Sequence, residues 1–234
     1  MVGSRRGNTV YAATAGGLSI STDGGATFTT RTTANGLGNN FVFGVYAVDS
    51  TVFAATYGGL GISTDGGATF TNRTSANGLA DLANYLVYGV HAGGDAVYAA
   101  TRGGLAISTD GGASFANRTT ADGLGDDTVF GVYAVGSVVY AATRGGLGIS
   151  TDGGASFTTR TTGDELGPAD GELDETEHNT SWVYASGSTV YAATLGGLSV
   201  STDGGATFTT RTTANGLGSN TVSGVYATAM GISR

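Results

Sequence analysis

Ser63-Thr64-Asp65-Gly66-Gly67-Ala68-Thr69-Phe70 is one of five nearly identical stretches in this chain of 234 residues, which differ only by Thr or Ser before the final Phe. Their aspartates are separated by 42, 45, 42 and 51 residues: Asp23, Asp65, Asp110, Asp152 and Asp203. A repeat of this length without helical periodicity is typical of a β-propeller, in which one four-stranded sheet, or blade, recurs around an axis. The sequence therefore predicts an all-β propeller.

Each repeat contains the pattern of one blade. In the second unit, the apolar run Phe41–Val48 predicts an innermost strand, and Thr51–Thr56 predicts the next. Leu60–Thr64 predicts a third strand, and Asp65-Gly66-Gly67 favours a tight hairpin turn because Asp-Gly accepts positive φ angles. Ala68–Thr74 then predicts the outermost strand. Four antiparallel strands with short turns make one blade.

The two ends of the chain hold complementary parts of one blade. Asn8–Thr14 matches a second strand, so the first blade lacks its innermost strand, whereas Thr221–Thr228 matches an innermost strand with no blade after it. We therefore expect residues 1–234 to form one domain. We expect this domain to be a five-bladed, monomeric ring. The ring would close when the C-terminal strand pairs with the N-terminal blade, and this pairing would cover an exposed sheet edge. A ring closed between chains and a piece of a larger array remain alternatives.

The amino-acid composition limits the classes of partner that the chain can bind and the cellular locations that it fits. The net charge of −8 argues against binding to nucleic acid, whose phosphates require a basic surface. No apolar run is long enough to span a membrane, no signal peptide is visible, and without cysteine there are no disulfides or thiolate sites. This acidic, Thr- and Gly-rich chain fits a bacterial extracellular or cell-surface protein and is also compatible with cytoplasm.

Two resemblances cover almost the whole chain apart from 1–7 and 163–180. The stretch Ser-Thr-Asp-Gly-Gly-Ala-Thr-Phe resembles the Asp-box repeat of bacterial sialidases and related propellers. The longer stretch Asn215–Ala227 resembles the repeat of two-component-regulator sensor propellers. These resemblances imply a propeller fold, and the second implies recognition of an extracellular ligand. Fold alone does not determine activity, because both repeats occur in proteins of many functions.

The repeated polar residues favour a structural role. An aspartate that opens a Gly-Gly turn accepts backbone hydrogen bonds, so the five Asp-box aspartates are expected to hold their loops rather than a metal. The arginines that recur once per outer strand are also expected to be structural, because every blade carries one and because charge on an exposed edge resists edge-to-edge pairing. Outside these repeats the sequence offers no arginine cluster or paired core carboxylates, which a sialidase-like hydrolase would need. We therefore expect no enzymatic activity.

Three departures from the repeat point to a binding surface. The residue before each Gly-Gly-Leu turn varies most: Ala15, Tyr57, Arg102, Arg144 and Leu195. The second departure is the acidic insertion 163–180, and the third is Trp182, which replaces an inner-strand glycine. Blade topology places the variable turns and the insertion on one rim, where loops on a rigid scaffold commonly bind. The candidate ligand-binding residues are Tyr57, Arg102, Arg144, Glu165, Asp170, Glu172, Asp174 and Trp182.

These observations predict a non-catalytic propeller that binds an unidentified protein or glycan, or acts as a scaffold, through this rim. A carbohydrate-binding lectin with one or few sites is the alternative, and a sialidase-like glycoside hydrolase is a more distant one. No cofactor is expected. Calcium at Asp170–Asp174 stays open because the acidic spacing is suggestive but incomplete. Trp182 is expected to fill space near the central channel, with a sugar-stacking platform as its alternative.

Overall fold

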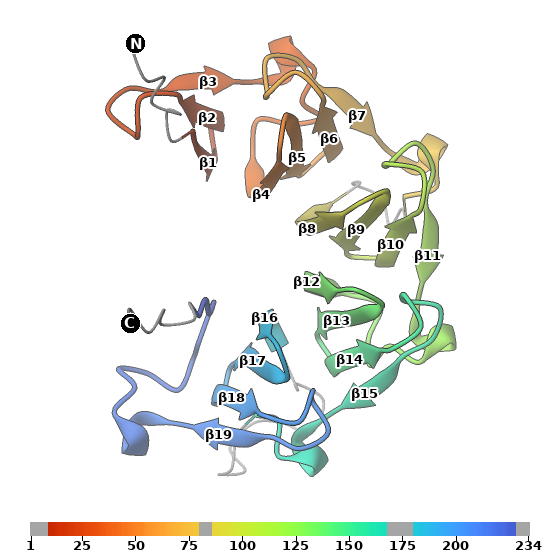
Figure 1. The fold of residues 1–234 in the computed structure, drawn as a ribbon, viewed down its shortest axis with the longest axis vertical. Helices are drawn as coiled ribbons and strands as arrows, with labels where there is room; N and C mark the ends of the chain where they lie inside the picture. Colours follow the sequence, from red (N-terminus) through yellow and green to blue (C-terminus); the bar gives the residue numbers. More distant parts are fainter. Residues whose placement is uncertain (1–8, 80–85, 168–179, 228–234) are drawn as a thin grey trace, which may run out of the picture.

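The computed structural model describes residues 9–79, 86–167 and 180–227, and these form five antiparallel β-sheets in an arc (Figure 1). The first sheet has three strands: β1 (Val10–Thr14), β2 (Gly17–Ser21) and β3 (Thr29–Arg31). The second has four: β4 (Val42–Val48), β5 (Thr51–Thr56), β6 (Gly59–Ser63) and β7 (Thr71–Arg73). The blade pattern predicted from the sequence is confirmed, and within the described residues the first sheet has no innermost strand, as predicted.

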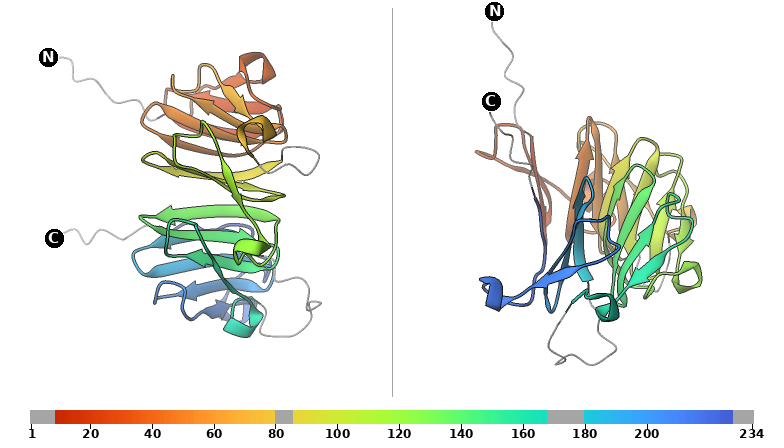
Figure 2. Two further views of the ribbon diagram at one scale, coloured as in Figure 1. Left: turned by 90° about the vertical axis from the view of Figure 1, so that its right-hand side faces the viewer. Right: turned by 60° about the horizontal axis from the view of Figure 1, so that its bottom comes forward.

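The remaining sheets repeat the second. The third comprises β8 (Val87–Gly93), β9 (Ala96–Thr101), β10 (Gly104–Ser108) and β11 (Ala116–Arg118). The fourth comprises β12 (Val129–Val135), β13 (Val138–Thr143), β14 (Gly146–Ser150) and β15 (Thr158–Arg160). The fifth comprises β16 (Thr180–Ser186), β17 (Thr189–Thr194), β18 (Gly197–Ser201) and β19 (Thr209–Arg211). Neighbouring sheets face each other around the arc, and Figure 2 shows this stacking from two further sides.

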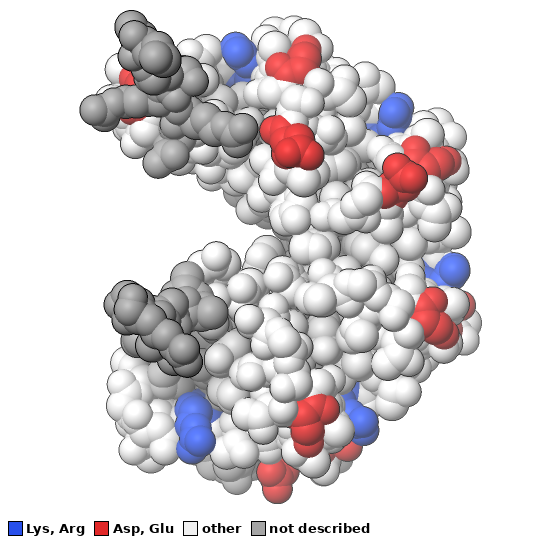
Figure 3. Space-filling model, viewed as in Figure 1, with Lys and Arg blue, Asp and Glu red and all other residues white. Residues whose placement is uncertain are grey.

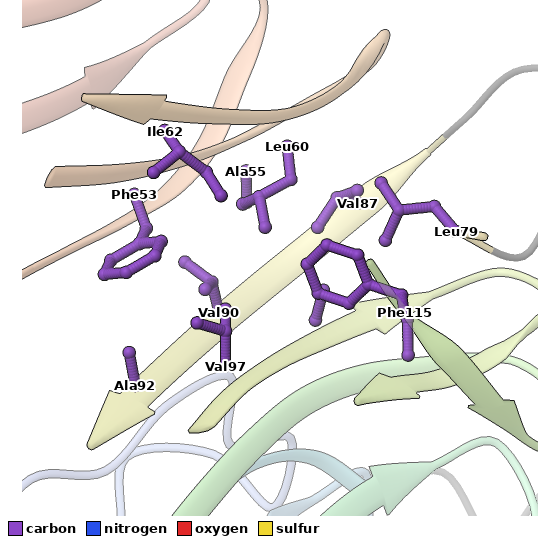
Figure 4. Close-up of a cluster of buried hydrophobic side chains, with 12 residues drawn as sticks. Phe53, Ala55, Leu60, Ile62, Leu79, Val87, Val90, Ala92, Val97 and Phe115 are labelled. Carbon is purple, nitrogen blue, oxygen red and sulfur yellow. The ribbon is translucent and has the colours of Figure 1, made fainter. Parts of the chain in front are cut away.

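The hydrophobic core lies in layers between adjacent sheets. In the layer between the second and third sheets, Phe53 and Ile62 face Val90 and Val97, and all four are buried (Figure 4). The alternation of apolar residues along each strand thus buries both faces of an internal blade, one against each neighbour. Equivalent clusters fill the layers between the other sheets.

The outermost strand is shorter than the sequence predicts, because the Asp box is a loop and not a tight hairpin. β7 begins only at Thr71, where it pairs with Ile62 of β6. Phe70 precedes the strand and its amide donates to the carbonyl of Asn35 in the preceding unit, 2.8 Å away. A short 3-10 helix follows each outer strand: Thr33–Asn35, Ser75–Asn77, Thr120–Asp122, Thr162–Asp164 and Thr213–Asn215.

The five sheets form an open arc. A gap separates β1 from the C-terminal segment 221–227 (Figure 1), and the space-filling view shows the same opening (Figure 3). The described part of this segment is irregular and lies beside the fifth sheet on the side of the gap, where the Val222 amide donates to the carbonyl of Thr194 in β17 at 2.9 Å (Figure 1). No pairing between this segment and β1 is found in the described residues, so ring closure stays a prediction.

Candidate functional site

Hydrogen bonds show which loops share an end of the blades. The Asn72 side chain donates to the carbonyl of Gly58 at 2.7 Å, which joins the outer strand β7 to the turn between β5 and β6. At the opposite end, the amide of Gly66 in the Asp box donates to the carbonyl of Ser50, in the turn between β4 and β5, at 2.9 Å. The variable turns and the Asp boxes therefore lie at opposite ends of the blades, as the topology predicts.

An aromatic cluster gathers at the end that carries the variable turns. Phe43 contacts Phe41, Tyr57 and Tyr88 with ring centroids 4.8, 6.3 and 5.6 Å apart, and Tyr88 contacts Phe130 at 5.4 Å. We call Phe41, Phe43, Tyr57, Tyr88 and Phe130 the rim aromatic cluster. The side chains of Phe41, Phe43 and Tyr57 are 44, 37 and 44% exposed. Because most large apolar side chains are buried, these three exposed aromatic rings, joined through Phe43, mark a candidate binding surface.

Two of the predicted rim residues belong to this surface. Tyr57 is a member of the cluster, and the positive charge of Arg102 acts on the Tyr88 phenol. Burial raises the pKa of Tyr88, and Arg102 partly opposes that shift. Arg144 is exposed in the equivalent turn of the next sheet, where its amide donates to the Thr128 carbonyl at 3.0 Å. The cluster therefore combines exposed ring faces with nearby guanidinium charge.

A second aromatic row follows the inner strands. Tyr46, His91, Tyr133, Tyr184 and Tyr226 succeed one another with ring centroids 4.7 to 5.0 Å apart, one residue from each inner strand and the last from the C-terminal segment. On the face shown in Figure 3, the inner edge of the arc is formed by uncharged residues. Burial lowers the pKa of His91, and a hydrogen bond with the backbone of Ala134 partly opposes this.

Trp182 packs against neighbouring inner strands. A Cβ atom at Gly131 of β12 would lie 3.1 Å from the indole of Trp182, and one at Gly89 of β8 would lie 3.7 Å from it. The glycines of two sheets therefore leave the space that the indole fills. The Trp182 side chain thus fills space beside neighbouring inner strands, and it is only partly exposed.

The acidic insertion lies mostly outside the described residues, and this includes Asp170, Glu172 and Asp174. Glu165 is described: it ends the 3-10 helix Thr162–Asp164 with a positive φ of 62°, and its carbonyl accepts a hydrogen bond from Thr210 at 2.9 Å. That contact places Glu165 beside the outer strand β19, whereas the rim aromatic cluster lies on the inner strands β4, β8 and β12, just before β4, and in the turn between β5 and β6. Among the described residues, no group of three or more His, Cys, Asp or Glu side chains could hold a metal ion.

Each Asp box is held by its own hydrogen bonds. In the second unit, Ser63 donates to one carboxylate oxygen of Asp65 at 2.6 Å, and Thr69 donates to the other at 2.6 Å. The Ala68 amide donates to the same carboxylate at 2.9 Å, and the Gly67 amide donates to the Ser63 hydroxyl at 2.8 Å. Gly66 and Gly67 have φ angles of 75° and 90°, which favour glycine. The carboxylate is thus occupied by groups of its own loop.

The repeated arginines connect successive blades. The side chain of Arg31 donates to the carbonyl of Gly67 in the next Asp box at 2.9 Å, and Arg73 donates to that of Gly112 at 2.7 Å. Arg118 and Arg160 make the same bond to the following units. Four of the five outer-strand arginines and the Gly-Gly pairs of the boxes that follow them are therefore parts of one repeated contact between neighbouring sheets.

The sequence analysis missed Phe41, Phe43, Tyr88 and Phe130. Phe43, Tyr88 and Phe130 occupy one repeat position, two residues beyond Phe41 in the second unit. An aromatic residue that recurs at one repeat position could have indicated a shared surface. The apolar run around it, however, predicts a buried strand, and therefore burial of every aromatic residue in that run. A bulge between Val42 and Gly44 interrupts the alternation of strand faces and places Phe43 on the exposed side.

Comparison with solved structures identifies the class of fold. An ancestral GH74 enzyme is similar with a TM-score of 0.66 and 18% identity, and the match covers 92% of this chain and 31% of that one. The extracellular domain of a protein named as a hybrid two component system, from B. thetaiotaomicron, has a TM-score of 0.64 and 17% identity, with coverage of 86% and 28%. PorZ, a surface component of the type-IX secretion system of Porphyromonas gingivalis, has a TM-score of 0.59 and 15% identity, with coverage of 86% and 26%.

These likenesses show a fold of β-propeller type. The chain spans about a third or less of each of these three structures. A scan against protein-family models and a search of curated proteins found no match. In the described part of the chain, no helix has the length and apolar character needed to cross a membrane.

Proposed function

We propose that this chain is a non-catalytic binding module that recognises its partner through the rim aromatic cluster and the adjoining variable turns. The observation that carries the proposal is the exposure of Phe41, Phe43 and Tyr57, in which the Phe43 ring contacts the other two. Exposed, preorganised aromatic rings supply large contact area at little entropic cost, which is typical of binding surfaces. The hydrogen bonds within each Asp box support a structural and non-catalytic role for its carboxylate.

A carbohydrate is the second candidate ligand, and the arrangement of Phe43 and Tyr57 favours it. Their rings are nearly parallel, at 26°, and both are partly exposed. Such ring faces can pack against the C–H groups of a sugar, while a guanidinium such as Arg102 can donate to its hydroxyls. The extracellular and surface proteins with similar folds support an extracellular or cell-surface location for this module.

The first test is a glycan array probed with the intact chain, with and without calcium. If the rim binds a glycan, we expect saturable binding that falls at least tenfold in the variant Tyr57→Ala, which corresponds to about 1.4 kcal/mol. Leu195→Ala is the matched control, because it truncates the equivalent turn residue in the fifth unit. Glycan binding that is unchanged by Tyr57→Ala would contradict the rim site, and an array without binding would contradict the carbohydrate candidate.

We also propose that the five sheets close into a monomeric ring. The C-terminal segment already occupies the place of an inner strand, because Tyr226 continues the aromatic row at 4.9 Å from Tyr184. The side of the segment that faces away from the fifth sheet is exposed, since Tyr226 is 76% exposed. The edge of β1 is also exposed: Val10 is 36% exposed, whereas Val52 and Val139, which occupy the same repeat position, are fully buried. Pairing the segment with β1 would cover both surfaces and remove two exposed edges.

Closure can be tested with two equivalent leucines. Leu124 is buried, whereas Leu217 at the open end is only partly buried. In a closed ring, Leu217→Ala should destabilise the chain as much as Leu124→Ala does, by about 2 to 4 kcal/mol, because both would leave a cavity. Urea unfolding of both variants measures the difference, and size exclusion should show a monomer. A loss for Leu217→Ala of less than half that for Leu124→Ala would contradict closure.

A further inference from the structure

A pocket of about 200 Å³ lies between the third and fourth sheets. Its walls are His91 and Gly93 of β8, Ala96 and Tyr98 of β9, and Ala134 and Gly136 at the end of β12. The turn between β8 and β9 borders the Asp-box end of the blades, since the Gly111 amide donates to the carbonyl of Asp95 at 2.9 Å. The pocket therefore lies away from the rim aromatic cluster and is independent of the function proposed for that rim.

Three departures from the repeat meet in this pocket. His91 stands where the other inner strands carry Tyr46, Tyr133 and Tyr184. Gly93 stands where the second and fourth units have Val48 and Val135, and Ala96 stands where they have Thr51 and Val138. Each of these three residues is smaller than its counterparts. Val48 and Val135 are themselves 42 and 47% exposed, so Gly93 removes volume at the solvent-facing end of this interface. The three smaller residues line the same wall of the pocket.

The chemistry of the walls is aromatic and uncharged at neutral pH. The imidazole of His91 lies between the rings of Tyr46 and Tyr133, at 4.8 and 4.7 Å. Burial lowers the pKa of His91, so the ring is neutral at pH 7, and burial raises the pKa of Tyr98, which keeps its phenol protonated. A neutral imidazole that uses one nitrogen in a hydrogen bond with the backbone has one nitrogen left as an acceptor.

We propose that this pocket binds a small neutral molecule that consists of one aromatic ring with a hydrogen-bond donor, of the phenol class. The size supports this class, because an apolar protein cavity of about 150 Å³ already admits benzene. His91 would accept the ligand's O–H or N–H, while Tyr98 and Ala96 pack against its ring. Charged ligands are disfavoured because none of the six wall residues carries a charge to pair with them.

The experiment is a phenol titration of the intact chain, followed by NMR through the imidazole proton signals of His91. We expect a saturable shift with a Kd of about 1 mM or tighter. Gly93→Val, which restores the residue of the second and fourth units, should weaken binding at least tenfold. Ser186→Val adds the same side chain at the equivalent position of the fifth unit and should leave the Kd unchanged. Toluene, which lacks a donor, should bind more weakly than phenol.

Two results would overturn the proposal. One is the absence of any saturable change in the His91 NMR signals up to about 20 mM phenol, because a Kd above that concentration would be too weak for a specific binding site. The other is an equal Kd for the wild-type chain and Gly93→Val, with both proteins folded by their amide spectra. Because Gly93→Val installs the repeat's own residue, loss of the fold is not expected to obscure the result.

Discussion

Replacement of Leu105 by alanine is expected to lower the free energy of unfolding by about 3 to 4 kcal/mol, because it leaves a cavity in a close-packed layer. Leu105 of β10 is fully buried in the cluster that joins the third and fourth sheets, where its neighbours include Leu124, Val129 and Phe157. The cavity would lie between two blades, so the loss would fall on the contact that keeps adjacent sheets together.

Urea unfolding of the wild-type chain and of Leu105→Ala measures this loss through the midpoint at constant slope. Leu195→Ala is the control, because Leu195 is a turn residue that is only partly buried, and its truncation should cost less than about 1 kcal/mol. If Leu105→Ala cost no more than Leu195→Ala, the layers between sheets would not carry the stability that we assign to them.

The blades themselves were predictable from the sequence because their determinants are local. The bounds of β5, Thr51–Thr56, match the prediction, since alternating apolar residues and flanking turn residues define such a strand. The Asp box was mistaken for a hairpin because Asp-Gly also fits a two-residue turn. What distinguishes the two is the hydrogen bonding of Ser63 and Thr69 to Asp65, together with the bond from Arg31 of the preceding sheet to Gly67.

The candidate sites were less predictable because they depend on contacts between sheets. Tyr57 and Arg102 could be found as departures from the repeat, but their relation to Tyr88 requires the positions of two adjacent blades. The pocket beside His91 shows the same limit. The sequence shows that His91 departs from the repeat. That the small residues Gly93 and Ala96 line a pocket with it can be seen only when β8 is placed against β12.

Acid should unfold this protein through its Asp boxes. The pKa of Asp65 is held well below its usual value of 3.8 by hydrogen bonds from the Ser63 hydroxyl and from the Thr69 hydroxyl and amide. Equivalent hydrogen bonds lower the pKa of the aspartates in the other four boxes: Asp23, Asp110, Asp152 and Asp203. A folded-state pKa below the unfolded one means that unfolding takes up protons as the pH falls. The stabilisation by these carboxylates is therefore complete above about pH 4 and decreases below it.

Unfolding by urea at a series of pH values from 7 to 2 measures this proton uptake from the slope of the unfolding free energy against pH. Five linked carboxylates should make the slope steep below about pH 4. His91 contributes separately, because its lowered pKa makes unfolding take up a proton already below about pH 6.5, and His91→Tyr removes that earlier step.

Asp65→Asn tests the assignment to the boxes, because an amide keeps the shape of the side chain but does not titrate. We expect the variant to be less stable at pH 7, because a neutral amide keeps only one acceptor oxygen for four donors, the Ser63 and Thr69 hydroxyls and the Ala68 and Thr69 amides. We also expect its proton uptake below pH 4 to be smaller by about one proton. An acid slope identical to that of the wild-type chain would mean that the acid sensitivity arises elsewhere. A reduced slope would show that the second Asp box contributes to the loss of stability in acid.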